Sequence, residues 1–452
     1  MYNVSIRATL DAISPPGGAI GAIMASPSKN HPDYFYHWIR DSAVTMDALA
    51  TLLNDARTPS ERTEWIRVLG DCAAFSASLQ RATGPFTSLG EPKWNMDGSP
   101  FTLDWGRPQN DGPASRASAL TKFAQFLNHQ YINTTHLYDP NNPNSRAAIQ
   151  VDLEYVVRHW REPSYDIWEE VAGTHFYTLM AQRRALLDGA LIAEKLEDFS
   201  SAARYTTQAK AMDPIIRTFW DPKLGYLRTT LNRTAGLDYK TSNLDVQVIL
   251  ASLHASLSHD AFMVPESDEI ISTLVALIIR FTPLYPINRV REAPGAPGDA
   301  LAPGIGRYPE DKYNGYDSKG QGNPWMLTTT AMAETLYRIR QAWQRAGRIP
   351  LTPATRRLLS YLSNQTDVEI VGMGEWDEIQ KGKDPRWEGY LNALKDLGDA
   401  FLRRVRYHSP KDLAQSEQWN RHTGFQQGAP HLTWSHVSFL SAIRVRRHIV
   451  PL

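Results

Sequence analysis

The chain has 452 residues, of which 42% are hydrophobic and 21% charged, proportions that exclude a disordered or fibrous protein. Lysine plus arginine and aspartate plus glutamate each number 48, so the formal net charge is zero and offers no field to attract nucleic acid or an anionic membrane. Cys72 is the only cysteine, which excludes an internal disulfide and a cysteine-ligated metal cluster.

Apolar residues recur mostly with the helical period, whereas strand-like alternation is scarce. In one such run, Tyr390, Leu394, Leu397, Phe401 and Val405 fall on one helical face. The pattern between the Pro, Gly and Asn breaks predicts an all-α protein of about twelve helices, or six pairs. In chain order, they are expected at 40–55, 61–82, 113–131, 144–160, 172–194, 197–219, 243–257, 266–281, 324–345, 353–365, 386–407 and 432–447.

The length would allow more than one domain, but large helical toroids run this long as one unit. No low-complexity tract or linker separates modules, so we predict a single domain over residues 1–452. No segment approaches the roughly 20 apolar residues of a membrane span, and the first residues lack the pattern of a signal peptide.

Long segments between the predicted helices are rich in Trp, Tyr, Gly, Pro and acidic residues. They cover 84–112, 161–170, 285–324 and 408–431. Loops of this length are uncommon in a compact chain unless they carry function. Aromatic faces stack on the apolar side of a pyranose, while carboxylates, amides and Arg bind its hydroxyl groups. The composition of these loops therefore favours a neutral sugar as ligand.

The first motif, over residues 32–41, directly precedes a predicted helix. It combines Tyr34 and Trp38 with the adjacent pair Arg40 and Asp41. An Arg beside an Asp can hold two hydroxyl groups of one sugar by bidentate hydrogen bonds. A helix cap with core aromatic residues would explain the same segment, and both interpretations stay open.

The second motif consists of residues 89–97 and 104–113, rich in turn residues and polar groups around Trp105. Such a segment makes a poor core but a good pocket rim. In the third motif, Glu169 and Glu170 lie beside Trp168. A carboxyl packed against an indole and near other acids has its protonated form favoured, as a general acid requires.

The fourth motif, over 306–315 and 322–325, contains Arg307, Tyr313 and Trp325, which suit the recognition of hydroxyl groups and rings. A calcium loop is the competing interpretation for its Asp and Asn residues, but their spacing matches no EF-hand. We therefore expect a sugar-binding loop here.

The fifth motif, over 413–420 and 432–435, contains Glu417 and Trp434. Glu417 lies far from Glu169 along the chain. Such a separation is expected if two glutamates approach one glycosidic bond from opposite sides.

In this order, the five motifs resemble the catalytic domain of fungal and yeast glucoamylases, glycoside hydrolase family 15, from about residue 10 to about residue 447. The resemblance implies an (α/α)6 barrel of inner and outer helices, with long loops forming a pocket. It also implies an exo-acting, inverting hydrolase that releases β-D-glucose from the non-reducing ends of α-1,4 glucans and, more slowly, α-1,6 glucans. Starch, glycogen-type glucans or maltooligosaccharides would be its substrates.

The resemblance also assigns roles to residues. Glu169 matches the general acid and Glu417 the general base. Asp41, Arg40 and Arg307 match groups that hold the sugar hydroxyls. The remaining matches in the substrate site are Tyr34, Trp38, Trp105, Asp166, the main chain of Ile167, Trp168, Glu170, Tyr313, Trp325 and Trp434.

Some positions depart from the family pattern. Ala172 replaces a frequent Asn, His431 a usual Asp, and the loop after Tyr313 is longer than in filamentous fungi. These changes bear on linkage preference and on binding of the second sugar. Two alternatives stay open: an α-1,6 glucodextranase or trehalase with the same fold, and a non-catalytic glucan-binding or regulatory domain.

We expect neither metal nor cofactor. The histidines form no metal-binding set, because they are scattered among loops, at His31, His37, His422, His431 and His436, where we expect most to be hydrogen-bonded surface or core groups. No glycine-rich phosphate loop or serine-nucleophile motif appears. Because the sequence stops soon after the last predicted helix, we expect no starch-binding module.

The Asn-x-Ser/Thr triplets at Asn3, Asn133, Asn232 and Asn364 would accept glycans only in an exported protein. We expect a monomer that is secreted through a leader absent from this sequence, with a vacuolar or cytoplasmic location as the alternatives.

Overall fold

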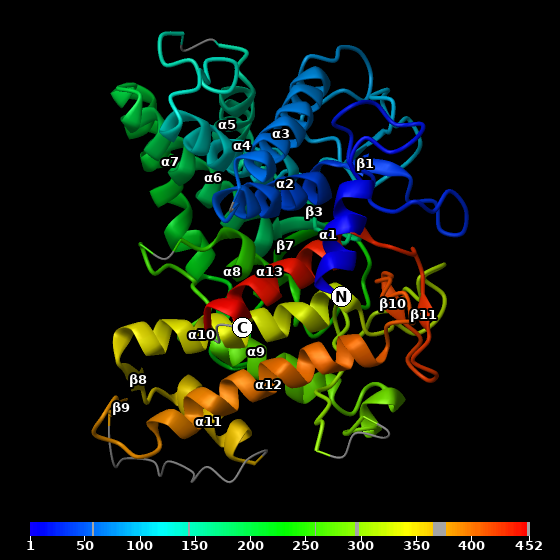
Figure 1. Ribbon diagram of the computed structural model, residues 1–452, viewed down its shortest axis with the longest axis vertical. Coiled ribbons are helices and arrows are strands. Elements are labelled where there is room, and N and C mark those ends of the chain that lie inside the picture. Colours follow the sequence, from blue (N-terminus) through cyan, green and yellow to red (C-terminus); the bar gives the residue numbers. More distant parts are fainter. Residues whose placement is uncertain (57, 143–144, 258, 294–297, 365–376, 450–452) are drawn as a thin grey trace.

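The computed structural model describes residues 1–452 apart from 57, 143–144, 258, 294–297, 365–376 and 450–452 (Figure 1). Six helices form an inner ring in which each packs against two others. They are α2 (Ile39–Asn54), α4 (Asp111–His129), α6 (Phe176–Lys195), α8 (Gln247–Ala255), α10 (Met326–Ala346) and α13 (Thr433–Ile449). Contacts between α13 and α2 close the ring.

A second layer of helices packs around the ring. α1 (Tyr2–Asp11) lies on α13, α3 (Pro59–Gln80) on α2, α5 (Ala148–His159) on α4, α7 (Phe199–Arg217) on α6, α9 (Asp268–Phe281) on α8, and α12 (Trp387–Tyr407) on α10. The remaining helix, α11 (Pro353–Ser363), packs beside α9 and α12. This arrangement confirms the predicted (α/α)6 barrel.

All the predicted helices are present, but the described residues hold one more than expected. The helix that sequence periodicity missed is α1, which lies against α13 (Figure 1). Its buried face is polar: Ser5 and Thr9 are almost fully buried. Ser5 Oγ accepts a hydrogen bond from Gln415 Nε2 (2.9 Å) and contacts His436 Nδ1 (3.1 Å). A polar buried face produces no apolar stripe, so the pattern predicted no helix there.

The predicted start of one helix was wrong because the residues there form a strand. Residues predicted to start α6 form strand β4 (Val171–His175) instead. By contrast, α3 starts close to its predicted position because a capping box defines its end. There, Thr58 Oγ1 accepts from the Glu61 N–H (3.1 Å), and the Glu61 carboxylate accepts from the Thr58 N–H (3.1 Å).

The strands of the described region are short and lie in the segments between helices. β1 (Tyr36–Trp38) pairs antiparallel with β2 (Lys93–Asn95), and β3 (Ser164–Tyr165), β4 and β7 (Thr230–Gly236) form a small sheet. The others are β5 (Trp220–Asp221), β6 (Tyr226–Leu227), β8 (Arg348–Pro350), β9 (Glu378–Gln380), β10 (Gln418–Trp419) and β11 (Gln426–Gln427), with a 3-10 turn at η1 (Pro286–Arg289). β1, β2, β10 and β11 lie near the starts of inner helices, whereas β8 and β9 follow the far end of α10 (Figure 1).

The inside of the ring also contains a cavity of about 430 Å³ lined by all six inner helices. Its charged groups are largely paired with one another: Asp47 binds Lys122 Nζ (2.7 Å) and Arg184 Nη2 (3.0 Å). The candidate catalytic glutamates do not line it. Within the described helices, none is both long and apolar enough to cross a membrane.

Candidate active site

The residues of the five motifs gather where the inner helices begin. Arg40 and Asp41 lie in the first turn of α2, Trp325 immediately precedes α10, and Trp434 lies in the first turn of α13. The segment that carries Glu169 immediately precedes β4, which leads into α6. Segments distant in sequence therefore meet at one end of the barrel.

Glu169 lies on a tight turn with a left-handed backbone, at φ 67°. Asp166 shapes this turn, because its Oδ1 accepts hydrogen bonds from the N–H groups of Glu170 (2.9 Å) and Val171 (3.2 Å). At the end of the side chain, Glu169 Oε1 accepts from Trp38 Nε1 (2.7 Å) and Gln109 Nε2 (3.1 Å). Both donors come from other loops and fix the direction of the carboxyl group.

Glu417 is fully buried and directly precedes β10. Its Oε1 accepts from the Tyr34 hydroxyl (2.9 Å), and its Oε2 accepts from the Tyr313 hydroxyl (3.4 Å) and the Ala429 N–H (3.3 Å). Burial raises its pKa to about 7, although these three donors oppose the shift. Gly428 leaves room for the carboxylate: a Cβ there would lie 2.2 Å from Glu417 Oε2.

One pair of aromatic residues connects the surroundings of the two glutamates. The Tyr34 and Trp38 rings are 5.4 Å apart at their centroids. Tyr34 donates to Glu417, and Trp38 donates to Glu169. The two carboxyl groups thus border the same aromatic pair, although more than half of the chain separates them.

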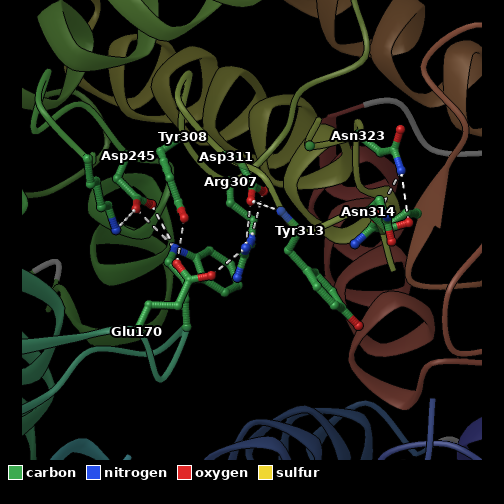
Figure 2. Close-up of polar contacts among 12 residues, drawn as sticks. Glu170, Asp245, Arg307, Tyr308, Asp311, Tyr313, Asn314 and Asn323 are labelled. Carbon is green, nitrogen blue, oxygen red and sulfur yellow. Dashed lines mark hydrogen bonds and ion pairs between the residues drawn. The ribbon is translucent and has the colours of Figure 1, made fainter. Parts of the chain in front are cut away.

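Glu170 faces a different group of residues from its neighbour in sequence. Figure 2 shows its carboxylate between Arg307 and Tyr308, whose Nη2 and hydroxyl each donate to it at 2.7 Å. Asp311 holds the same guanidinium through Nε (2.9 Å) and Nη2 (2.7 Å). Burial raises the pKa of Glu170 to about 7, while Arg307 opposes the shift.

Beneath Glu170 lies a buried ionic group. Lys240 Nζ binds Asp245 (2.5 Å) and Asp166 (3.2 Å), and Asp245 accepts from Trp168 Nε1 (3.0 Å). Burial tends to raise the pKa of Asp166, but Lys240 brings it below its ordinary value. Asp166 is fully buried, and its carboxylate holds the turn that carries Glu169.

Arg40 is bound mainly to residues other than its neighbour Asp41. Its Nη1 donates to Gln109 Oε1 (3.0 Å) and Asp111 Oδ2 (3.1 Å), whereas Nε lies 3.9 Å from Asp41. Burial raises the pKa of Asp41 to about 6 against the effect of Arg40. Gln109 therefore bridges Arg40 and Glu169.

The aromatic residues form a continuous lining. Trp168 lies 5.6 Å from Trp325 and 6.4 Å from Trp434 between ring centroids, and Tyr313 lies 6.3 Å from Trp325. Trp105, with 40% of its surface exposed, lies at the rim. The main chain of Ile167 belongs to the same turn as Glu169. Apolar ring faces with hydrogen-bonding groups between them suit a pyranose.

Several supporting residues escaped the sequence analysis. Lys240 and Asp245 lie outside the five motifs, whereas Asp311 belongs to the fourth. All three complete the ion pairs of the site, but no motif predicts which buried charges will meet. Gln109 was part of the second motif, and its position after Pro108 gave no signal of its contact with Glu169. In the described part of the chain, no cluster of three or more His, Cys, Asp and Glu residues is suited to a metal ion.

Comparisons with known proteins bear on the family to which the chain belongs. A family model described as "Glycosyl hydrolases family 15" matches residues 5–444. The glucoamylase of Blastobotrys adeninivorans is 35% identical, over 97% of this chain and 69% of that protein. The intracellular sporulation-specific glucoamylase of Saccharomyces cerevisiae is 32% identical, over 99% of this chain and 82% of that protein.

Among solved structures, the Saccharomycopsis fibuligera glucoamylase matches with a TM-score of 0.86 and 28% identity, over 99% of this chain and 94% of that one. The family 15 glucoamylase from Hypocrea jecorina matches with a TM-score of 0.84 and 31% identity, over 100% of this chain and 72% of that one.

Proposed function

The chain belongs to glycosyl hydrolase family 15 and is a glycosidase of the glucoamylase type; from that premise, we propose that it releases β-D-glucose from the non-reducing ends of α-1,4 and, more slowly, α-1,6 glucans. Glu169 is the general acid and Glu417 the general base. The whole chain forms one catalytic domain.

In this mechanism, Glu169 protonates the glycosidic oxygen as the bond to the leaving sugar breaks. Glu417 removes a proton from a water molecule, which attacks the anomeric carbon from the opposite face. Inversion then converts an α-glucoside into β-glucose. The two carboxyl groups of an inverting enzyme lie about 6.5–9.5 Å apart, which leaves room for that water.

One observation supports this assignment above others: the two carboxyl groups flank the Tyr34 and Trp38 pair, each held by one of these side chains. The Tyr34 hydroxyl and the Ala429 N–H favour the ionised form of Glu417, which a base needs. In this proposal, the guanidinium N–H groups of Arg40 and Arg307 donate hydrogen bonds to the hydroxyl groups of the terminal glucose.

The test replaces each glutamate by its neutral isostere. We expect Glu169→Gln and Glu417→Gln to lower kcat on maltose by at least about a hundredfold, because general acid–base catalysis contributes that much or more. Circular dichroism should show an unchanged fold. A variant that keeps a near-normal rate would disprove its assigned role.

Proton NMR of the wild-type reaction tests the stereochemistry. The β-anomer of glucose should appear first and then mutarotate; early appearance of α-glucose would contradict inversion. Rates on maltose, isomaltose and trehalose separate the proposed activity from a glucodextranase or trehalase, and binding of maltooligosaccharide without glucose release would indicate a non-catalytic domain.

A further inference from the structure

A lysine with unusual surroundings lies next to the proposed general acid. Lys93 on β2 pairs in register with Trp38 on β1, so the two side chains lie on the same face of the strand pair. Tyr36, two residues before Trp38, points to that face as well. Lys93 is 2% exposed. The described structure gives its Nζ no hydrogen bond or ion pair with another side chain.

Four aromatic rings enclose this ammonium group. Nζ lies 3.3 Å from the ring centroid of Trp105, 4.1 Å from Phe101, 4.4 Å from Trp38 and 4.6 Å from Tyr36. Neighbouring rings meet edge to face. The interplanar angles are 85° for Tyr36 and Trp38, 65° for Trp38 and Trp105, 86° for Trp105 and Phe101, and 77° for Phe101 and Tyr36. The rings form a four-sided aromatic box, and their negative faces attract the cation.

This arrangement is costly if Lys93 serves only to fill space. Removing an ammonium group from water without an anionic partner is unfavourable, and the ring faces compensate for only part of that cost. Burial lowers the pKa of Lys93 to about 8, while Glu169 and Asp33 oppose the shift and Arg107 adds to it. A methionine would fill the same box without the penalty, so the charge itself requires an explanation.

Trp38 is one of the four rings around Lys93 and also contacts the proposed general acid. Trp38 contacts the ammonium with its ring face and donates to Glu169 with its Nε1 (2.7 Å). We propose that Lys93 is a positioning residue of the reaction: its caged ammonium fixes the Trp38 indole against Glu169 and stabilises the carboxylate that remains when Glu169 gives up its proton. The inference rests on the proposed role of Glu169 as general acid.

Chemical rescue separates the charge from the volume of the side chain. Lys93→Ala removes three methylene groups and the ammonium, so propylammonium replaces the missing atoms, and 1-propanol matches it in length without the charge. We expect Lys93→Ala to lower kcat on maltose about tenfold or more, which corresponds to the loss of one desolvated cation–π contact. Propylammonium should raise the kcat of Lys93→Ala several-fold, and 1-propanol should leave it unchanged.

Three outcomes would overturn the inference. The first is near-normal activity of Lys93→Ala, and the second is equal rescue by propylammonium and 1-propanol. The third is no rescue by propylammonium although Lys93→Ala has the circular dichroism spectrum of the wild type. If Lys93→Ala does not fold, Lys93→Met decides. That variant keeps the box filled and removes only the charge, while Arg40 Nη2 still lies 3.7 Å from Glu169 Oε1. We expect its kcat on maltose to fall about tenfold. A near-normal kcat of Lys93→Met would refute the inference.

Lys122→Met is the matched control. Lys122 binds Asp47 inside the barrel, away from the catalytic glutamates, and Asp47 keeps Arg184 as a partner. Its kcat on maltose should match that of the wild type. Full activity of Glu169→Gln would refute the proposed function itself, whereas normal behaviour of the Lys93 variants beside an inactive Glu169→Gln would refute only this inference.

Discussion

Glu169 and Glu417 have the same side chain but meet different surroundings. Glu169 is half-buried and bound by an indole and an amide, while Glu417 is fully buried and bound by two phenols and a backbone N–H. A group that must bind a proton and a group that must release one need different environments. At the residue scale, the loops provide this difference.

Tyr34→Phe tests the environment of Glu417. Burial raises the pKa of Glu417 to about 7, and the Tyr34 hydroxyl lowers it by stabilising the carboxylate. Without the hydroxyl, the pKa rises further. Because a general base works only when ionised, the acid limb of the kcat/KM profile should move to higher pH.

Tyr138→Phe is the control for this prediction, because the Tyr138 hydroxyl makes a similar hydrogen bond to Asp198 (2.8 Å) outside the site. Its pH profile should equal that of the wild type. A Tyr34→Phe profile that does not move, or moves to lower pH, would show that Glu417 does not set the acid limb.

At the scale of elements, buried ion pairs connect the helices. Arg116 on α4 and Asp152 on α5 form a bidentate pair, with Nε–Oδ2 at 2.8 Å and Nη2–Oδ1 at 2.7 Å. Both side chains are nearly inaccessible to solvent. The pair joins an inner helix to its outer partner, and each charge depends on the other for compensation.

We expect Arg116→Leu to lower the free energy of unfolding by about 3–5 kcal/mol, since it leaves a buried carboxylate without a counterion. The double variant Arg116→Leu, Asp152→Leu should be more stable than Arg116→Leu alone, because it removes both charges. Urea unfolding measures each value.

The exposed pair Arg67 and Glu64 on α3 provides the comparison, and Arg67→Ala should cost less than about 1 kcal/mol. Equal losses for Arg116→Leu and Arg67→Ala would contradict the importance of burial.

At the scale of the whole molecule, buried carboxyl groups of the active site make the free energy of unfolding depend on pH. Burial raises the pKa of Asp41 to about 6 and the pKa values of Glu170 and Glu417 to about 7. Between about pH 4.5 and 7, the unfolded chain has released these protons and the folded chain still binds them. These three carboxyl groups therefore make the free energy of unfolding fall as the pH rises through this window. Four buried histidines act in the opposite direction below about pH 6.5, because burial lowers the pKa values of His37, His254, His408 and His436.

Calorimetry of the wild type and Glu417→Gln at pH 5 and pH 8 isolates the contribution of one carboxyl group, because the histidines act equally in both proteins. Glu417→Gln removes one of the buried charges, so its Tm should exceed that of the wild type at pH 8 and lie close to it at pH 5. An equal change of Tm between pH 5 and pH 8 in both proteins would show that Glu417 does not contribute.

The sequence by itself determined the helical class and the positions of most helices, because an amphipathic helix needs only a local pattern of apolar residues. It missed α1, whose buried face carries Ser5 and Thr9. The order of the motifs predicted the family, which the comparisons confirm, and with it the barrel.

Only the tertiary structure decided which side chains meet. Gln109 bridges Arg40 and Glu169, Lys240 joins two buried aspartates, and Lys93 enters its aromatic box through contacts between distant segments. The physical reason is that hydrogen bonds and ion pairs act over a few ångströms in space, whatever the separation along the chain. Local patterns determine the helices, but the closure of the ring brings together the loops that hold the glutamates.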